Sequence, residues 1–187
     1  MKNSATRYGV VTKVLHWAVF LLFVNQFVVA TAMLNTPQGQ TTAGFTQGTL
    51  YNWHKSTGLI LLGVALVRYL WRKRTPVPDW APNLSDREKR WIGVIERTLY
   101  GCMFLMPLSG YIYVMTGGYG VNFFGHWHLP NFPGKNATVA SITEWTHKLT
   151  ACLIVITLLA HWSLAIRHQW IHRDRYLNRM LPFTHQR

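Results

Sequence analysis

Acidic residues are scarce in this chain. Only 6 of its 187 residues are Asp or Glu, against 19 Lys and Arg, and the formal net charge is +13 at pH 7. Cysteine is scarcer still, and its two copies, Cys102 and Cys152, both lie in apolar runs. We expect them to pack as small hydrophobic side chains, which leaves no disulfide framework and no cysteine metal site. The excess of positive charge alone would suit a nucleic-acid binder, so its distribution along the chain decides between classes of protein.

Long hydrophobic runs dominate the rest of the sequence. The chain is 49% hydrophobic with 9 Trp, and its mean hydropathy of +0.07 is high for a soluble protein. A transmembrane helix needs about 20 apolar residues, and four stretches approach that length. The first is longer than the apolar core of a usual secretory signal peptide, so we interpret it as a transmembrane helix. The four expected spans are residues 14–34, 54–71, 98–116 and 145–167.

Positive charge gathers at one end of the expected spans. Sixteen of the 19 lysines and arginines lie in the first 13 residues, in residues 68–97 or from residue 167 onward. The other two connections hold few cations, namely Lys55, Lys135 and Lys148. The positive-inside rule then places both termini and the middle connection in the cytoplasm, which requires four spans. Orientation and contact with the lipid bilayer account for the charge, so we expect no nucleic-acid partner. The sequence predicts a single all-α domain, residues 1–187, folded as an integral membrane four-helix bundle.

Four histidines occupy the ends of the expected spans. His147 and His161 stand fourteen residues apart in the last one. On an α-helix fourteen residues advance about 21 Å and fall about 40° short of four turns, so both imidazoles leave nearly the same face. Ionisable residues inside a membrane helix usually mark function. Orientation places His54, at the start of the second span, beside His147 near the outer face. It places His16, at the start of the first, beside His161 near the cytoplasmic face.

Two imidazole pairs at two depths suit one haem each. A haem iron held by two neutral imidazoles is closed to direct oxygen binding and suits electron transfer, and helix bundles build cofactor sites between facing helices. We therefore expect two haem b groups. The iron ligands would be His16 with His161 in one group and His54 with His147 in the other. The sequence lacks Cys-x-x-Cys-His, so neither haem is attached covalently by that route.

Simpler explanations exist for some of these residues. A single histidine at the mouth of a membrane helix is more often interfacial than a ligand. Gly58 follows His54 by one helical turn, where a side chain would meet a haem ring, and Gly63, Gly101 and Gly110 can serve likewise. Glycines in membrane helices are as often helix-packing residues. The paired depths and the fourteen-residue spacing are harder to obtain by accident.

Several short motifs and single residues, spread over all four expected spans, can be compared with known families. They are Arg7-Tyr8-Gly9, His16-Trp17, His54-Lys55-Ser56-Thr57-Gly58, Arg68, Arg72, Tyr100, Leu105, Pro107, Gly110, His147, His161 and His168. With these motifs the chain resembles, over nearly its whole length, the bacterial cytochrome b561 family. These are membrane di-haem b-type cytochromes that also resemble the cytochrome b subunit of nickel-iron hydrogenases. The family's ligand roles carry over onto the four histidines with the pairing that depth gives.

The resemblance implies transmembrane electron transfer in the bacterial inner membrane. The implied activities are quinone reduction (ubiquinone being a candidate substrate), superoxide oxidation with electrons passed to quinone, and exchange with a partner redox enzyme such as a hydrogenase. In some relatives a histidine at the position of His168 lies by the quinone, and an interfacial histidine is the simpler alternative. Lys55 and Lys148 each follow an outer ligand directly. They would bind haem propionates, attract an anion such as superoxide, or anchor helix ends.

A second class of function stays open on the residues alone. A cofactor-free membrane transporter or scaffold could use the same histidines to relay protons, and a visible spectrum separates it from a cytochrome. His126 and His128, in the connection before the last span, are too few for a metal site without a third ligand.

Overall fold

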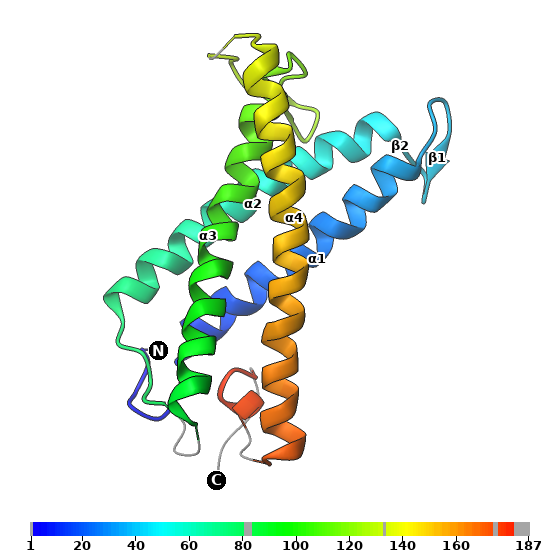
Figure 1. Ribbon diagram of the computed structural model, residues 1–187. Coiled ribbons are helices and arrows are strands. Elements are labelled where there is room, and N and C mark those ends of the chain that lie inside the picture. The colour runs from blue at the N-terminus through cyan, green and yellow to red at the C-terminus, as the bar shows by residue number, and fades with distance from the viewer. Residues whose placement is uncertain (1, 81–83, 133, 174–175, 182–187) are drawn as a thin grey trace.

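Four long helices make up most of the protein. The computed structural model describes residues 2–80, 84–132, 134–173 and 176–181. Two short β-hairpins join consecutive helices, and the last helix runs into a π-helical turn (Figure 1). The elements are α1 (Val10–Asn35), β1 (Thr41–Thr42), β2 (Phe45–Thr46), α2 (Gln47–Arg74), α3 (Asp86–Thr116), β3 (Asn122–Phe123), β4 (Trp127–His128), α4 (Ala137–Ile166), the π-helical turn Arg167–Ile171 and a 3₁₀ turn Tyr176–Arg179.

The ends of the helices follow from local sequence. Ser85 and Glu88 form a capping box at the start of α3, which satisfies backbone N–H groups that have no partner inside the helix. Asn136 accepts a hydrogen bond from the Val139 amide at the start of α4. Gly117 ends α3, and the next residue, Gly118, has a φ of +79°, which favours glycine. Local sequence therefore fixes the start of α3, the end of α3 and the start of α4.

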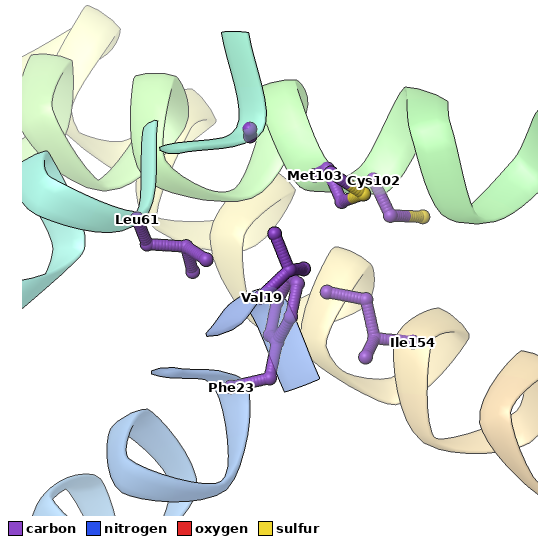
Figure 2. Packing of buried hydrophobic residues seen from close by; sticks show 7 residues of the cluster. Val19, Phe23, Leu61, Cys102, Met103 and Ile154 are labelled. Carbon is purple, nitrogen blue, oxygen red and sulfur yellow. The ribbon is translucent and has the colours of Figure 1, made fainter. Parts of the chain in front are cut away.

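The core lies where the two halves of the chain cross. α1 packs on α2 and α3 packs on α4, and the first pair crosses the second at a large angle (Figure 1). Buried side chains from all four helices meet at this crossing, as Figure 2 shows for most of them. The buried cluster consists of Val19, Phe23, Leu61, Ala65, Cys102, Met103 and Ile154.

Much of the surface is apolar, as the predicted membrane location requires. By length and composition α1, α3 and α4 with its π-helical turn are able to cross a membrane, and these are the helices that qualify among the described residues. The expected all-α architecture is confirmed in this coarser form. α2 has 28 residues, but its capped first turns and the Arg72–Arg74 end are polar. Its crossing of the bilayer stays a prediction.

The helices are longer than the expected spans. α3 begins at Asp86, so the charged segment before residue 98 is the first part of the same helix. α2 begins at Gln47, because the Thr46 hydroxyl caps it, and residues 47–52 belong to the helix instead of the preceding loop. α4 likewise begins eight residues before the expected span at 145.

Chain segments from both ends of the sequence meet beside the first turns of α1. Lys13 Nζ donates to the Leu181 carbonyl at 2.7 Å, and Trp17 Nε1 donates to the Met180 carbonyl at 3.0 Å. Arg179 also bonds the carbonyl of Asp79, which belongs to the connection between α2 and α3. The described parts of the N-terminal segment, this connection and the tail therefore lie on one side. Arg175 and Arg187, counted above among the basic residues from residue 167 onward, lie outside the described residues.

Candidate functional site

The structure brings the four histidines together in two pairs. The imidazole centres of His54 and His147 lie 6.2 Å apart, with the ring planes at 80°. Those of His16 and His161 lie 6.3 Å apart, with the planes at 45°. α4 supplies one histidine to each pair, because the helix crosses α2 near one end and α1 near the other. These are the pairs that the depth argument predicts.

Both separations fit a metal placed between the rings. An imidazole nitrogen lies about 1.2 Å from its ring centre and binds a first-row metal at about 2.0 Å, so two opposed ligands have centres about 6.4 Å apart. Direct contact between two rings would allow a shorter separation. Among the described residues no group of three or more His, Cys, Asp or Glu could hold a bare metal ion. A metal that brings its own equatorial ligands, as haem iron does, needs only the two axial imidazoles.

His147 is held in the orientation that a ligand needs. Its Nδ1 lies 2.9 Å from the Met106 carbonyl of α3, and since a carbonyl only accepts, Nδ1 carries the proton and donates it. The Nε2 lone pair is therefore left for a metal. Gly110 makes this approach possible, because a Cβ there would stand 2.8 Å from two atoms of the imidazole. Gly110, one turn after Met106, thus allows the imidazole to pack directly against α3.

A cavity adjoins this pair. It has a volume of about 430 Å³ and is lined by residues of all four helices, among them His54, His147, Gly58 and Gly110. That volume is within the range of cofactor sites, about 300–1,000 Å³. His54 Nδ1 is buried without a hydrogen-bond partner among the described residues, which is costly unless a bound group or water completes it. The residues present fit a large flat cofactor at this end.

The other pair is surrounded by aromatic and basic side chains. Arg68 Nη2 lies 3.1 Å from His16 Nδ1, and its guanidinium lies over the Tyr100 ring at 5.6 Å. Because a guanidinium only donates, His16 Nδ1 accepts this bond, and its proton then sits on Nε2. For Nε2 to bind a metal the proton must return to Nδ1, so Arg68 has to turn away. The ring separation fits a haem here, and one hydrogen bond must be exchanged for it to bind.

The two lysines beside the outer histidines already have partners. Lys55 Nζ donates to the Gly120 carbonyl at 2.9 Å, which ties the segment before β3 to α2. Lys148 forms an ion pair with Glu144 at 2.6 Å and lies over the Trp145 ring. The sequence left propionate binding, anion attraction and helix-end anchoring open for both lysines, and in the structure Lys55 holds a loop. Both still line the cavity together with their histidines.

His168 is fully buried in the π-helical turn. Only 1% of its surface is exposed, and its Nε2 lies 3.7 Å from a Glu88 carboxylate oxygen. Arg167 approaches the same carboxylate at 3.5 Å. π-helical turns inside or after α-helices are frequent at functional sites. An interfacial histidine that reaches toward water would be exposed, so burial counts against that alternative.

Some site residues escaped the sequence argument. Gln26 of α1 is buried, and its amide donates to the His54 carbonyl and to the Thr57 hydroxyl. A polar residue inside an apolar run is a signal that could have identified it. Gly63 and Gly101 are exposed, and a Cβ at either would meet nothing within 4 Å, so neither makes room beside a histidine.

The helices are apolar and carry imidazoles that face one another in pairs. These features are typical of helical membrane proteins that hold a cofactor between their helices. The family model of prokaryotic cytochrome b561 matches residues 7–183, and the chain belongs to this family. It is therefore a membrane electron-transport protein whose family implies b-type haem. The resemblance inferred from the sequence is confirmed.

Three curated relatives match over most of their length. Cytochrome b561 homolog 2 of Escherichia coli is 26% identical over 96% of this chain and 93% of its own. Cytochrome b561 homolog 1 of the same organism is 24% identical over 90% and 93%. The probable superoxide oxidase CybB of Yersinia pestis is 24% identical over 97% and 96%.

Proposed function

We propose that the chain transfers electrons through two haem b groups, each held by two histidines. The observation that carries this proposal is the pair of ring separations, 6.2 Å for His54 with His147 and 6.3 Å for His16 with His161. Haem supplies a one-electron redox centre that is closed to direct oxygen binding when both axial positions are imidazoles. In a proton-relaying transporter the ring separations could take any value in the ordinary contact range of about 4.5–7 Å, whereas two haem sites require a separation near 6.4 Å in both pairs.

The two pairs would form a route across the membrane. His147 and His161 lie fourteen residues apart on α4, about 21 Å along its axis, which is most of a hydrocarbon core of about 30 Å. We propose that α2 is the fourth span, that both termini are cytoplasmic, and that the protein is a multi-pass component of the bacterial inner membrane. The contacts that join the N-terminal segment to residues 176–181 support this arrangement. Reporter fusions at the two termini and in the 75–85 connection would test it.

We propose superoxide as the electron donor at the His54–His147 end. One relative is named as a probable superoxide oxidase. The cations on that side are Lys55, Lys135 and Lys148, and the one acidic residue of the sequence there is Glu144. Lys148 is neutralised by Glu144, so the net charge comes from the other two lysines. A net positive entrance raises the encounter rate with an anion. Each superoxide would give up one electron and leave as oxygen. Two such electrons, together with two protons, would reduce one quinone to quinol.

Mixing the haem-loaded protein with superoxide should reduce its haem rapidly, and ubiquinone should then reoxidise it. The reduction rate should fall as ionic strength rises, because salt screens the attraction over a Debye length of about 10 Å at 0.1 M. Lys135→Gln should lower the rate at low salt and leave the spectrum unchanged. Stopped-flow spectroscopy measures both. A slow rate that changes neither with salt nor with Lys135→Gln would favour the alternative. In that case the protein would be a cytochrome b subunit that serves a partner redox enzyme such as a hydrogenase.

We propose that quinone reacts at the other end, beside His168. The imidazole is buried in the π-helical turn seven residues after His161. A Glu88 carboxylate oxygen lies 3.7 Å from its Nε2 and stabilises a proton held on that nitrogen. A quinone carbonyl that gains electrons needs protons, and a buried histidine with an acidic neighbour is suited to provide them.

His168→Ala should slow electron exchange between haem and ubiquinone by about 100-fold or more, the scale on which general acids contribute. Both haem spectra should stay as in the parent protein, because His168 is not an axial ligand in this scheme. His172→Ala is the matched control, since its ring lies 5.0 Å from that of His168 but on the exposed side of the turn. Reoxidation kinetics after a reductant pulse provide the measurement. Equal rates in His168→Ala and the parent would place the quinone site elsewhere.

A further inference from the structure

The first turns of α3 carry a small basic pocket on the outside of the protein. Arg87, Arg90, Trp91 and Val94 line a surface pocket of about 370 Å³. All four side chains are exposed, and Trp91 is 59% accessible. Spacings of three, four and seven residues place them on one helix face. None of these four residues lines the cavity beside His54 and His147.

The two arginines of this pocket have no acidic partner among the described residues. Arg87 and Arg90 form no ion pair with any described residue. The carboxylates of α3 that could neutralise them are already engaged elsewhere, so no carboxylate in the described part of the chain compensates the two guanidinium groups. The ion pairs that engage those carboxylates are Asp86 with Lys89, Glu88 with Arg167 and Glu96 with Arg72.

The same face of α3 continues as an exposed apolar stripe. Below the pocket, within a sector of about 60° on a helical projection, lie Val94, Gly101, Leu105, Leu108 and Ile112. The four apolar side chains are 37–47% accessible. Gly101 is also exposed, and a Cβ there would meet nothing within 4 Å. The glycine thus leaves a notch in the stripe, at the centre of a helix that is able to cross the membrane.

We propose that this face of α3 binds one anionic phospholipid. The phosphate would lie between Arg87 and Arg90, where guanidinium groups bind phosphate with paired hydrogen bonds. Trp91 would lie at the glycerol level, the depth that tryptophan prefers in bilayers. An acyl chain would then follow the stripe and fill the notch at Gly101. A free phosphate ion or an acidic protein segment would use the arginines and leave the apolar stripe below them without a role.

Native mass spectrometry of the full, haem-loaded chain can test this site. The probes are phosphatidylglycerol and phosphatidylcholine with identical acyl chains. We expect phosphatidylglycerol to bind more tightly, and the Arg87→Gln/Arg90→Gln protein to bind it roughly tenfold or more weakly, since a basic residue at the membrane surface contributes about fivefold. Lys73→Gln/Arg74→Gln, at the end of α2, removes the same charge elsewhere and should change little. Haem spectra should be unaffected in both proteins.

The acyl-chain part of the site has its own test. Gly101→Leu should weaken binding of both lipids by filling the notch, whereas Gly63→Leu, at an equally open glycine of α2, should not. Equal binding of the two lipids, or equal losses in both double variants, would mean general surface charge and would overturn the proposal. Displacement of the lipid by millimolar inorganic phosphate would identify a phosphate site instead. Binding of a second copy of the chain, visible as a dimer that the double variant loses, would equally overturn it.

Discussion

Replacing either His54 or His147 with alanine should remove the same haem, and the haem content should fall from about two to about one per chain. An iron that loses one of two axial imidazoles becomes high-spin or leaves the protein. In the proposed site these two imidazoles, whose centres lie 6.2 Å apart, would be the opposite ligands of one iron. Pyridine haemochrome analysis of purified protein counts the haems, and acid-acetone extraction establishes that they are not covalently attached.

The second pair provides the complementary experiment. His16→Ala and His161→Ala should remove the other spectral component and spare the first. His126→Ala is the control, because this histidine is exposed in the turn between β3 and β4 and should leave both haems in place. One haem per parent chain would contradict the four-ligand scheme. So would loss of the same component in His16→Ala and His54→Ala.

Helical periodicity and charge alone predicted which histidines would meet. Fourteen residues on a straight helix fix the separation and direction of His147 and His161 whatever the surroundings. The partners at the starts of the first two spans followed because positive charge set the direction of each span. These properties depend on local geometry and on the bilayer. They can be read before any packing is known, and the structure places the same pairs together.

Details that depend on helix rotation could not be predicted. The sequence offered Gly58, Gly101 and Gly110 as glycines that make room for a haem ring. In the structure the first lines the cavity, the second faces outward, and the third lies against an imidazole. Their roles depend on where α2 and α3 cross α4, which no local pattern specifies. The bond of His147 to the Met106 carbonyl could not be predicted either. Every residue has a backbone carbonyl, so the sequence does not show which one accepts a hydrogen bond.

The connections between helices differ from expectation for a related reason. Lys55 was expected to bind a haem propionate, attract an anion or anchor a helix end. In the structure it bonds the Gly120 carbonyl, and the Ser56 hydroxyl accepts a bond from the Phe124 amide. Sixty-five residues separate Lys55 from its acceptor. Such a contact is invisible to arguments from neighbouring residues. The sequence therefore predicted the positive charge of this surface. It did not predict that Lys55 would hold the loop before β3 in place.

Gly110→Ala should remove most of the haem held by His54 and His147 (the outer haem), while the haem held by His16 and His161 (the inner haem) remains. The added Cβ would stand 2.8 Å from the His147 ring, so the ring must move, and the 2.9 Å bond to the Met106 carbonyl would break with it. Orienting partners of this kind typically contribute 10- to 100-fold to metal affinity. Overpacking alone would cost about 1–3 kcal/mol of stability, so the helices should remain folded. Spectral titration with haem compares the affinity of the two sites.

Gly101→Ala separates the effect of position from that of the amino acid. It makes the same change in the same helix, nine residues earlier, at an exposed glycine whose Cβ would meet nothing. Because alanine has the higher helix propensity, by about 1 kcal/mol, this protein should be as stable as the parent and hold both haems. If Gly110→Ala also keeps both haems at parent affinity, the bond between His147 and the Met106 carbonyl does not orient the ligand. Loss of the inner haem instead of the outer one would mean that His147 serves the other pair.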